Sequence, residues 1–185
     1  MLNSSSAMKQ MWQRALPRLG MLFLLGGLSF GVAAATRDVD QFFFDQKLGD
    51  FKAELASAKK SGKQGILLMF EQADCPWCHR MKTTVLNQSE VQDYYKARFL
   101  IFPMDIKGDT PMVDFKGRET TEKAFSAENR ARATPVFGFF DLDGNLVFRW
   151  TGVTKDAAEF LLLGRYVADG AYKNQSFAVY KQGTK

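Results

Sequence analysis

An uninterrupted apolar run, residues 66–70, is the feature that most constrains the fold of this chain. A strand that is apolar at every position is typical of a sheet interior covered on both faces. Residues 99–102 form a second such run, and helical patterns over 77–86 and 89–95 lie between the two. Strands separated by helices predict a parallel pair at the centre of a sheet.

The second half of the chain predicts an antiparallel pair. Two further apolar runs, 136–140 and 146–150, flank a turn that contains Asp143-Gly144, a step typical of hairpins. A helix from Asp50 to Gly62 precedes the first strand, and a last helix follows Asp156. These elements predict an α/β fold, a mixed four-stranded sheet with helices on both faces.

Three other segments are expected to complete this domain. Residues 106–132 are polar and interrupt the core elements, so we predict an insertion that contains a small hairpin and a helix over 122–129. The phenylalanines of residues 42–44 are expected to pack a short N-terminal segment onto the domain. The tail beyond Gly170 is polar with scattered aromatic residues, and we expect it to dock loosely.

Residues 1–35 have the layout of a secretory signal peptide. Lys9, Arg14 and Arg18 precede an apolar run that ends in Ala33-Ala34-Ala35, a small-residue cleavage site. A retained membrane anchor is the alternative, but glycines interrupt the run, and a spanning helix needs about 20 predominantly apolar residues. We therefore expect export, with residues 36–185 as one domain whose core covers about 45–170.

The charge of the chain gives little support for a nucleic-acid partner. The net charge is +5, but three of the 25 basic residues belong to the predicted signal peptide. The other 22 nearly balance the 20 acidic residues, and they do not cluster in the sequence. We expect no nucleic acid among the partners.

Both cysteines and the only histidine lie in one hexapeptide, Cys75-Pro76-Trp77-Cys78-His79-Arg80. This spacing fits a redox-active dithiol, and it also fits covalent attachment of c-type haem. At a helix start, free N–H groups and the positive helix end lower the pKa of Cys75 below about 8.5. Cys75 is therefore the expected exposed nucleophile, and the more buried Cys78 the expected resolving thiol.

The neighbours of the two cysteines have simpler expected roles. Pro76 suits the first helical position, where its missing N–H is not needed. Pro76 and Trp77 are expected to tune the redox poise, and Trp77 to offer an exposed apolar contact to partner proteins. His79 and Arg80 either add positive potential near Cys75 or are ordinary surface residues of the helix.

Three alternatives to a dithiol fit the hexapeptide less well. A purely structural disulfide would close a very short loop and add little stability. Haem would need His79 and a second axial ligand, for which Met104 and Met112 are available, but the predicted sheet is unlike a small helical cytochrome. Zinc would lack a fourth ligand. We expect no cofactor and no metal.

The order of these elements resembles the thioredoxin fold over nearly all of residues 45–170. The motifs that carry the resemblance are the Cys-x-x-Cys at a helix start and Thr134-Pro135 before a strand, turn, strand and helix. The export signal, the Cys-Pro-Trp-Cys motif, the insertion and Ala133-Thr134-Pro135 look most like periplasmic thioredoxin-related proteins of the SoxW type. The resemblance implies that Pro135 is cis and lies against the dithiol. It also implies that Thr134 offers its backbone to an extended substrate segment.

One position departs from the family pattern. Cytosolic thioredoxins carry a buried aspartate six residues before the first cysteine, and this chain has Met69 there. Glu71 lies on the same face of the strand, because side chains alternate along it. We hypothesise that Glu71 assists deprotonation of Cys78, with a solvated carboxylate at the strand end as the alternative.

The sequence thus predicts an exported, periplasmic thiol-disulfide oxidoreductase. The resemblance implies a reductant of disulfide-bearing periplasmic proteins, recharged by a membrane electron donor of the DsbD or CcdA kind. The alternatives are a disulfide-donating oxidant and a non-catalytic thiol chaperone or binding module that uses Pro76 and Trp77. A haem carrier fits the sequence least well.

Overall fold

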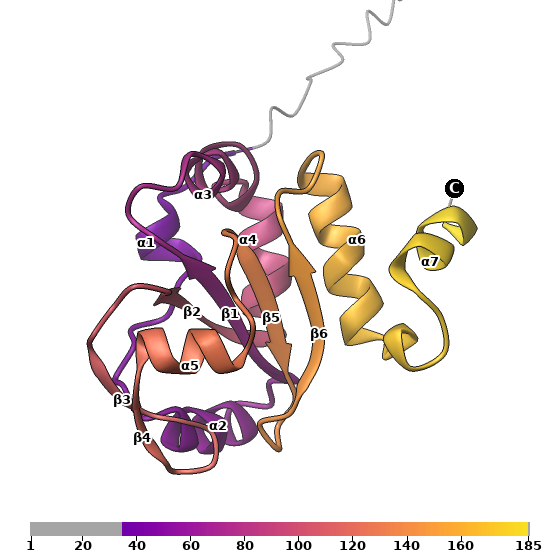
Figure 1. Ribbon diagram of the computed structural model, residues 1–185. Helices are drawn as coiled ribbons and strands as arrows, with labels where there is room; N and C mark the ends of the chain where they lie inside the picture. Colours follow the sequence, from indigo (N-terminus) through magenta and orange to yellow (C-terminus); the bar gives the residue numbers. More distant parts are fainter. Residues whose placement is uncertain (1–34, 185) are drawn as a thin grey trace, which may run out of the picture. The chain divides into compact units, whose positions relative to one another are not determined.

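The computed structural model describes residues 35–184, whose centre is a four-stranded sheet of order β2-β1-β5-β6 (Figure 1). β1 (Gly65–Glu71) pairs in parallel with β2 (Phe99–Asp105) and antiparallel with β5 (Val136–Phe140). β5 pairs antiparallel with β6 (Leu146–Thr151). The predicted mixed sheet is confirmed.

Helices cover both faces of this sheet, as the sequence predicted. The apolar residues of two helices, α2 (Phe51–Lys60) and α5 (Glu122–Glu128), pack on one face. The other face is covered by α1 (Val39–Phe42), α3 (Pro76–Met81), the π-helix η1 (Lys82–Leu86), α4 (Ser89–Lys96), α6 (Ala157–Ala168) and α7 (Phe177–Gly183), with the 3-10 turn η2 (Ala171–Lys173) between α6 and α7.

The predicted signal peptide lies outside the described residues, apart from Ala35. Within residues 35–184, none of the helices combines the length and apolar character that crossing a bilayer requires.

Alternation along β1 divides the core into two clusters. Leu67 and Met69 point into the cluster under α4 and α6, whereas Ile66, Leu68 and Phe70 point into the cluster under α2 and α5. All five side chains are buried. Positions 66–70 of this strand are all apolar, which agrees with the coverage of both of its faces.

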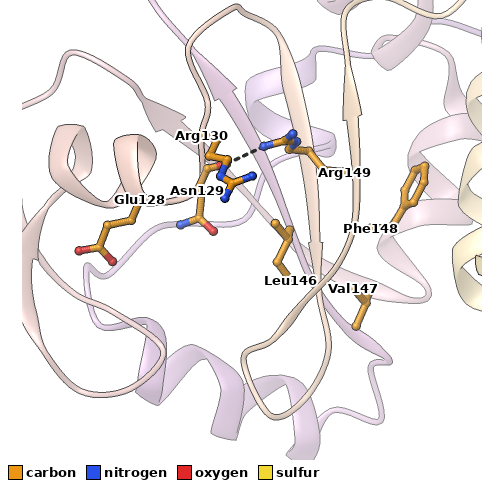
Figure 2. Close-up of a pocket in the computed structure, with 7 residues that line it drawn as sticks. All are labelled: Glu128, Asn129, Arg130, Leu146, Val147, Phe148 and Arg149. Atoms are coloured by element: carbon orange, nitrogen blue, oxygen red, sulfur yellow. Dashed lines mark hydrogen bonds between the residues drawn. The ribbon is translucent and has the colours of Figure 1, made fainter. Parts of the chain in front are cut away.

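The insertion lies between β2 and β5 and forms the predicted hairpin and helix. β3 (Pro111–Val113) pairs antiparallel with β4 (Glu119–Thr121), and α5 follows directly. Phe125 of α5 is buried in the cluster that contains Phe70. The end of α5 is also tied to the sheet, because Arg149 Nη1 of β6 donates a hydrogen bond to the carbonyl oxygen of Asn129 at 3.1 Å (Figure 2).

The two ends of the domain differ from one another in how well they were predicted. Phe43 and Phe44 are buried, which confirms that the N-terminal segment packs onto the domain. The prediction of a loosely docked tail is wrong. Phe177 of α7 is buried, with ring centroids 5.4 Å from both Trp150 and Tyr166. Phe177 and Tyr180 lie one helical turn apart in α7, and both rings pack against Tyr166 of α6.

A buried carboxylate in α2 generates a stability prediction. Glu54 is 7% exposed, and no lysine or arginine among the described residues forms an ion pair with it. Burial raises the pKa of Glu54, a backbone hydrogen bond from Leu48 opposes the increase, and the charges of Asp45 and Asp50 add to it. The fold therefore favours the protonated acid, and stability is lost as pH rises from the unfolded-state pKa toward the folded-state pKa.

We expect Glu54→Gln to raise the free energy of unfolding at pH 7 by about 1 kcal/mol. The gain should vanish near pH 3.5, where the glutamate is protonated in both states. Urea unfolding at both pH values measures this difference, with Glu90→Gln on the exposed side of α4 as control. An equal effect of Glu54→Gln at both pH values would contradict the prediction.

Candidate active site

The cysteine motif starts α3. Cys75 is the N-cap residue, with extended backbone angles, and its Sγ accepts a hydrogen bond from the backbone N–H of Cys78 at 3.0 Å. Pro76 is the first residue of the helix, where a missing N–H costs no hydrogen bond. The strand β1 ends at Glu71, so only a short turn separates the sheet from this helix.

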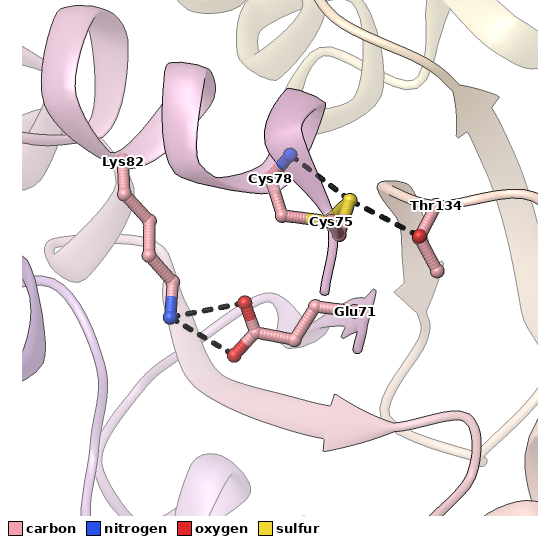
Figure 3. The surroundings of a disulfide bond; sticks show 5 residues. All are labelled: Glu71, Cys75, Cys78, Lys82 and Thr134. Carbon is pink, nitrogen blue, oxygen red and sulfur yellow. Dashed lines mark hydrogen bonds and ion pairs between the residues drawn. A yellow bond between two sulfur atoms is a disulfide. The ribbon is translucent and has the colours of Figure 1, made fainter. Parts of the chain in front are cut away.

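Cys75 and Cys78 are joined in a disulfide bond, with Cα atoms 5.2 Å apart (Figure 3). Cys75 is 7% exposed and Cys78 is 3% exposed. Cys75 is the more accessible of the two, as predicted, but it is buried, so the prediction of an exposed sulfur at Cys75 is wrong. The N-cap position turns its sulfur back over the helix, and Thr134 approaches it from the other side.

The loop before β5 lies against the disulfide, as the resemblance implied. The Thr134–Pro135 peptide bond is cis, and Pro135 is buried. Thr134 Oγ1 lies 3.1 Å from Cys75 Sγ, so its hydroxyl can donate a hydrogen bond to the sulfur (Figure 3). The N–H of Gly152 donates to the carbonyl oxygen of Pro135 at 2.8 Å and ties the loop to the end of β6.

A polar pocket of about 350 Å³ adjoins the disulfide at the ends of β1 and β2. Both cysteines line it, together with Glu71, Asp105, His79 and Lys82. Glu71 and Asp105 are register partners in the parallel pair, so their side chains leave the sheet on the same face. Lys82 Nζ lies 3.0 Å and 2.9 Å from the two carboxylate oxygens of Glu71 (Figure 3).

Sequence reasoning missed Lys82. It stands four residues after Cys78, at the first position of the π-helix η1, a kind of distortion that is frequent at functional sites. Lys82 also lies 3.8 Å from Asp40 and 5.3 Å from the ring centroid of Phe44. The available signal was the four-residue spacing, which places a lysine on the same side of a helix as the resolving cysteine.

The structure places the remaining residues of the hexapeptide at the surface. Trp77 is 55% exposed, and its ring centroid lies 5.7 Å from the guanidinium carbon of Arg80. His79 is exposed at the edge of the polar pocket. Within residues 35–184, histidine, cysteine and acidic side chains form no cluster of three or more that could hold a metal ion.

The arrangement can perform disulfide exchange. One sulfur is held among hydrogen-bond donors at a helix start, a second lies one turn away, and ionisable groups line a polar pocket beside both. The cysteine pair, the cis-proline loop and the helix start meet although 59 residues separate Cys75 from Thr134.

Comparisons with known proteins agree with this geometry. A family model described as a thioredoxin-like domain matches residues 51–168. A comparison with curated proteins returns no match.

Two solved structures are similar in fold. A thioredoxin-fold protein from Helicobacter pylori is 21% identical with a TM-score of 0.54, and the match covers 64% of this chain and 83% of that one. The oxidoreductase DsbH is 18% identical with a TM-score of 0.53, and the match covers 76% of this chain and 92% of that one. The family match, the sheet order and the Cys75–Cys78 pair at a helix start lead to one conclusion: the chain belongs to the thioredoxin-like domain family.

Proposed function

We propose that this protein is a thiol-disulfide oxidoreductase that reduces disulfide bonds of partner proteins through Cys75 and Cys78. The observation that carries the proposal is the disulfide at the start of α3, with Thr134 Oγ1 3.1 Å from Cys75 Sγ. A disulfide between residues three apart adds little stability to a fold. Its position among hydrogen-bond donors at a helix start instead favours thiolate chemistry.

The reaction passes two electrons from the protein to its partner. The Cys75 thiolate attacks one sulfur of the partner's disulfide, which breaks, and the first partner thiol leaves. The Cys78 thiolate then attacks Cys75 Sγ and releases the second partner thiol, which closes the Cys75–Cys78 disulfide. The N–H of Cys78 and the hydroxyl of Thr134 both face Cys75 Sγ, where they stabilise the negative charge of its thiolate.

The neighbouring residues have the following roles in this proposal. Thr134, beside the cis Pro135, offers its backbone to an extended segment of the partner. Pro76 and Trp77 tune the redox poise, and the exposed Trp77 contacts the partner's surface. Glu71 accepts the proton of Cys78, which is supported by the polar pocket that both residues line.

We further propose that the protein works in the periplasm and is related to the SoxW type. The signal-peptide pattern of residues 1–35 supports export. In an oxidising compartment a dithiol is regenerated only by an active reductant, so a membrane electron donor of the DsbD or CcdA kind would supply the electrons.

We expect the domain of residues 36–185 to reduce insulin and to have a reduction potential of about −270 mV. The potential is measured by equilibration with dithiothreitol, and Cys75→Ser should abolish insulin reduction. A potential near −120 mV, without insulin reduction, would identify an oxidant instead. If the domain shows no turnover and Cys75→Ser binds partners as well as the parent, the protein is a binding module. A red haem spectrum would identify a cytochrome.

We expect Thr134→Val to make the reduction potential more negative by about 10–30 mV. The hydroxyl stabilises the reduced, thiolate form. A loss of part of the free energy of one charge-assisted hydrogen bond corresponds to a shift of that size in the potential. Thr134→Ser keeps the hydroxyl and is the matched control. If the two variants shift the potential equally, the hydrogen bond does not contribute.

We expect Glu71→Gln to slow the resolving step at least tenfold and to change its pH dependence, because the variant lacks a proton acceptor. Rapid-quench measurement of the mixed disulfide follows this step. Lys82→Gln is the control, since it breaks the same ion pair but keeps the carboxylate. A pH profile for Glu71→Gln that matches the parent would show that Glu71 is only a strand-end carboxylate.

A further inference from the structure

Three exposed arginines, on β6 and on the segment between α5 and β5, lack a carboxylate partner among residues 35–184. Arg130, Arg132 and Arg149 have no carboxylate oxygen within 4.0 Å. Arg37 and Arg118, in contrast, both form ion pairs at 2.7 Å. We call Arg130, Arg132 and Arg149 the basic strip.

The basic strip leads to the disulfide. Arg130 and Arg132 lie four and two residues before Thr134, whose hydroxyl lies 3.1 Å from Cys75 Sγ. Arg149 lies across from Gly138 in the β5–β6 pair, and its side chain donates to the carbonyl oxygen of Asn129. The three positive charges therefore lie at the end of α5, on the adjoining part of β6 and in the loop before β5, whose Thr134 contacts Cys75.

A groove of about 440 Å³ forms the far end of the strip. Arg130 and Arg149 both line it, together with Glu128, Asn129 and Leu146 (Figure 2). Leu146 is 39% exposed, so the groove offers an apolar contact beside two guanidinium groups. Glu128 is the carboxylate in its lining, and Arg118 holds that side chain at 2.8 Å. Because Glu128 pairs with Arg118, it does not neutralise the arginines of the basic strip.

The backbone at Arg130 is a second, independent observation. Arg130 has φ 56°, directly after the C-cap of α5, where glycine is usually found. A side chain in this left-handed conformation is unfavourable, because its Cβ lies too close to the following carbonyl oxygen. A positive charge is favourable at the C-terminus of a helix, because it interacts with the negative end of the helix dipole. This interaction explains an arginine at position 130. The helix dipole does not explain Arg132 and Arg149, which lie outside α5.

We propose that the basic strip docks an acidic segment of the disulfide-bearing partner protein. The inference rests on the proposed function and names the chemistry of its partner. Unpaired guanidinium groups recognise carboxylates with forked hydrogen bonds, and a run of like charges speeds encounter with a segment of opposite charge. An extended partner segment that lies along Thr134 would continue over Arg132 toward the groove.

Two synthetic peptides test the proposal with the reduced, full-length protein. Both contain the same intramolecular disulfide, flanked by aspartate and glutamate in one and by serine and asparagine in the other. Single-turnover reduction in low salt gives kcat/KM for each. We expect the acidic peptide to be reduced about threefold to tenfold faster, with the ratio falling toward one in about 1 M salt.

The variant Arg130→Gly/Arg132→Gln removes two charges, and glycine suits the positive φ at 130. It should bring the ratio of acidic to neutral peptide close to one. The control Arg165→Gln/Lys173→Gln removes two charges from α6 and η2, which pack on the opposite face of the sheet. It should leave the ratio near the parent value.

Each other outcome overturns the docking proposal. A parent ratio of one shows that the strip does not select acidic segments, and equal losses in both double variants assign the effect to net charge. A ratio of one together with strip-dependent binding to phosphatidylserine vesicles assigns the arginines to a membrane surface. Failure to reduce either peptide contradicts the proposed function itself, and is thereby distinct from failure of the docking surface.

Discussion

The coverage of β1 on both faces is the constraint on which the rest of the structure depends. β1 is bonded to β2 on one side and to β5 on the other, and its alternate side chains enter the two core clusters. A strand held in this way cannot slip by one residue without moving apolar side chains to different neighbours. Its last residue, Glu71, and the cysteine motif that follows are therefore fixed relative to the loop before β5.

Because these elements are fixed, the hydrogen-bond donors and charged groups around the disulfide keep constant positions relative to the two sulfurs. Cys75 faces the N–H of Cys78 and the hydroxyl of Thr134, which are donors held by a helix start and by a loop tied to β6. The polar pocket adjoins the same disulfide with Glu71, Asp105 and Lys82. The two donors therefore lie at Cys75 Sγ, whereas the ionisable groups line a pocket beside the whole disulfide.

The sequence predicted the sheet well because each strand carries its own signal. Residues 66–70 and 99–102 are apolar throughout, and Asp143-Gly144 marks the hairpin between β5 and β6. Lys82 was missed because the four-residue spacing from Cys78 does not reveal its ion pair with Glu71, which lies eleven residues away on a strand. The burial of Cys75 and the docking of Phe177 likewise depend on distant partners, Thr134 and Trp150, and so require the tertiary structure.

The direction of electron flow depends on how the two sides of the disulfide balance. Donors that face Cys75 stabilise the reduced, thiolate form and make a dithiol a poorer reductant. A carboxylate in the pocket beside Cys78 opposes a second negative charge there and favours the closed disulfide, which makes the dithiol a better reductant. Lys82 offsets much of that carboxylate charge, since it contacts both oxygens of Glu71. The charge that the pocket presents to the disulfide is therefore the balance of Glu71, Asp105 and Lys82, all of which lie outside the Cys-Pro-Trp-Cys motif.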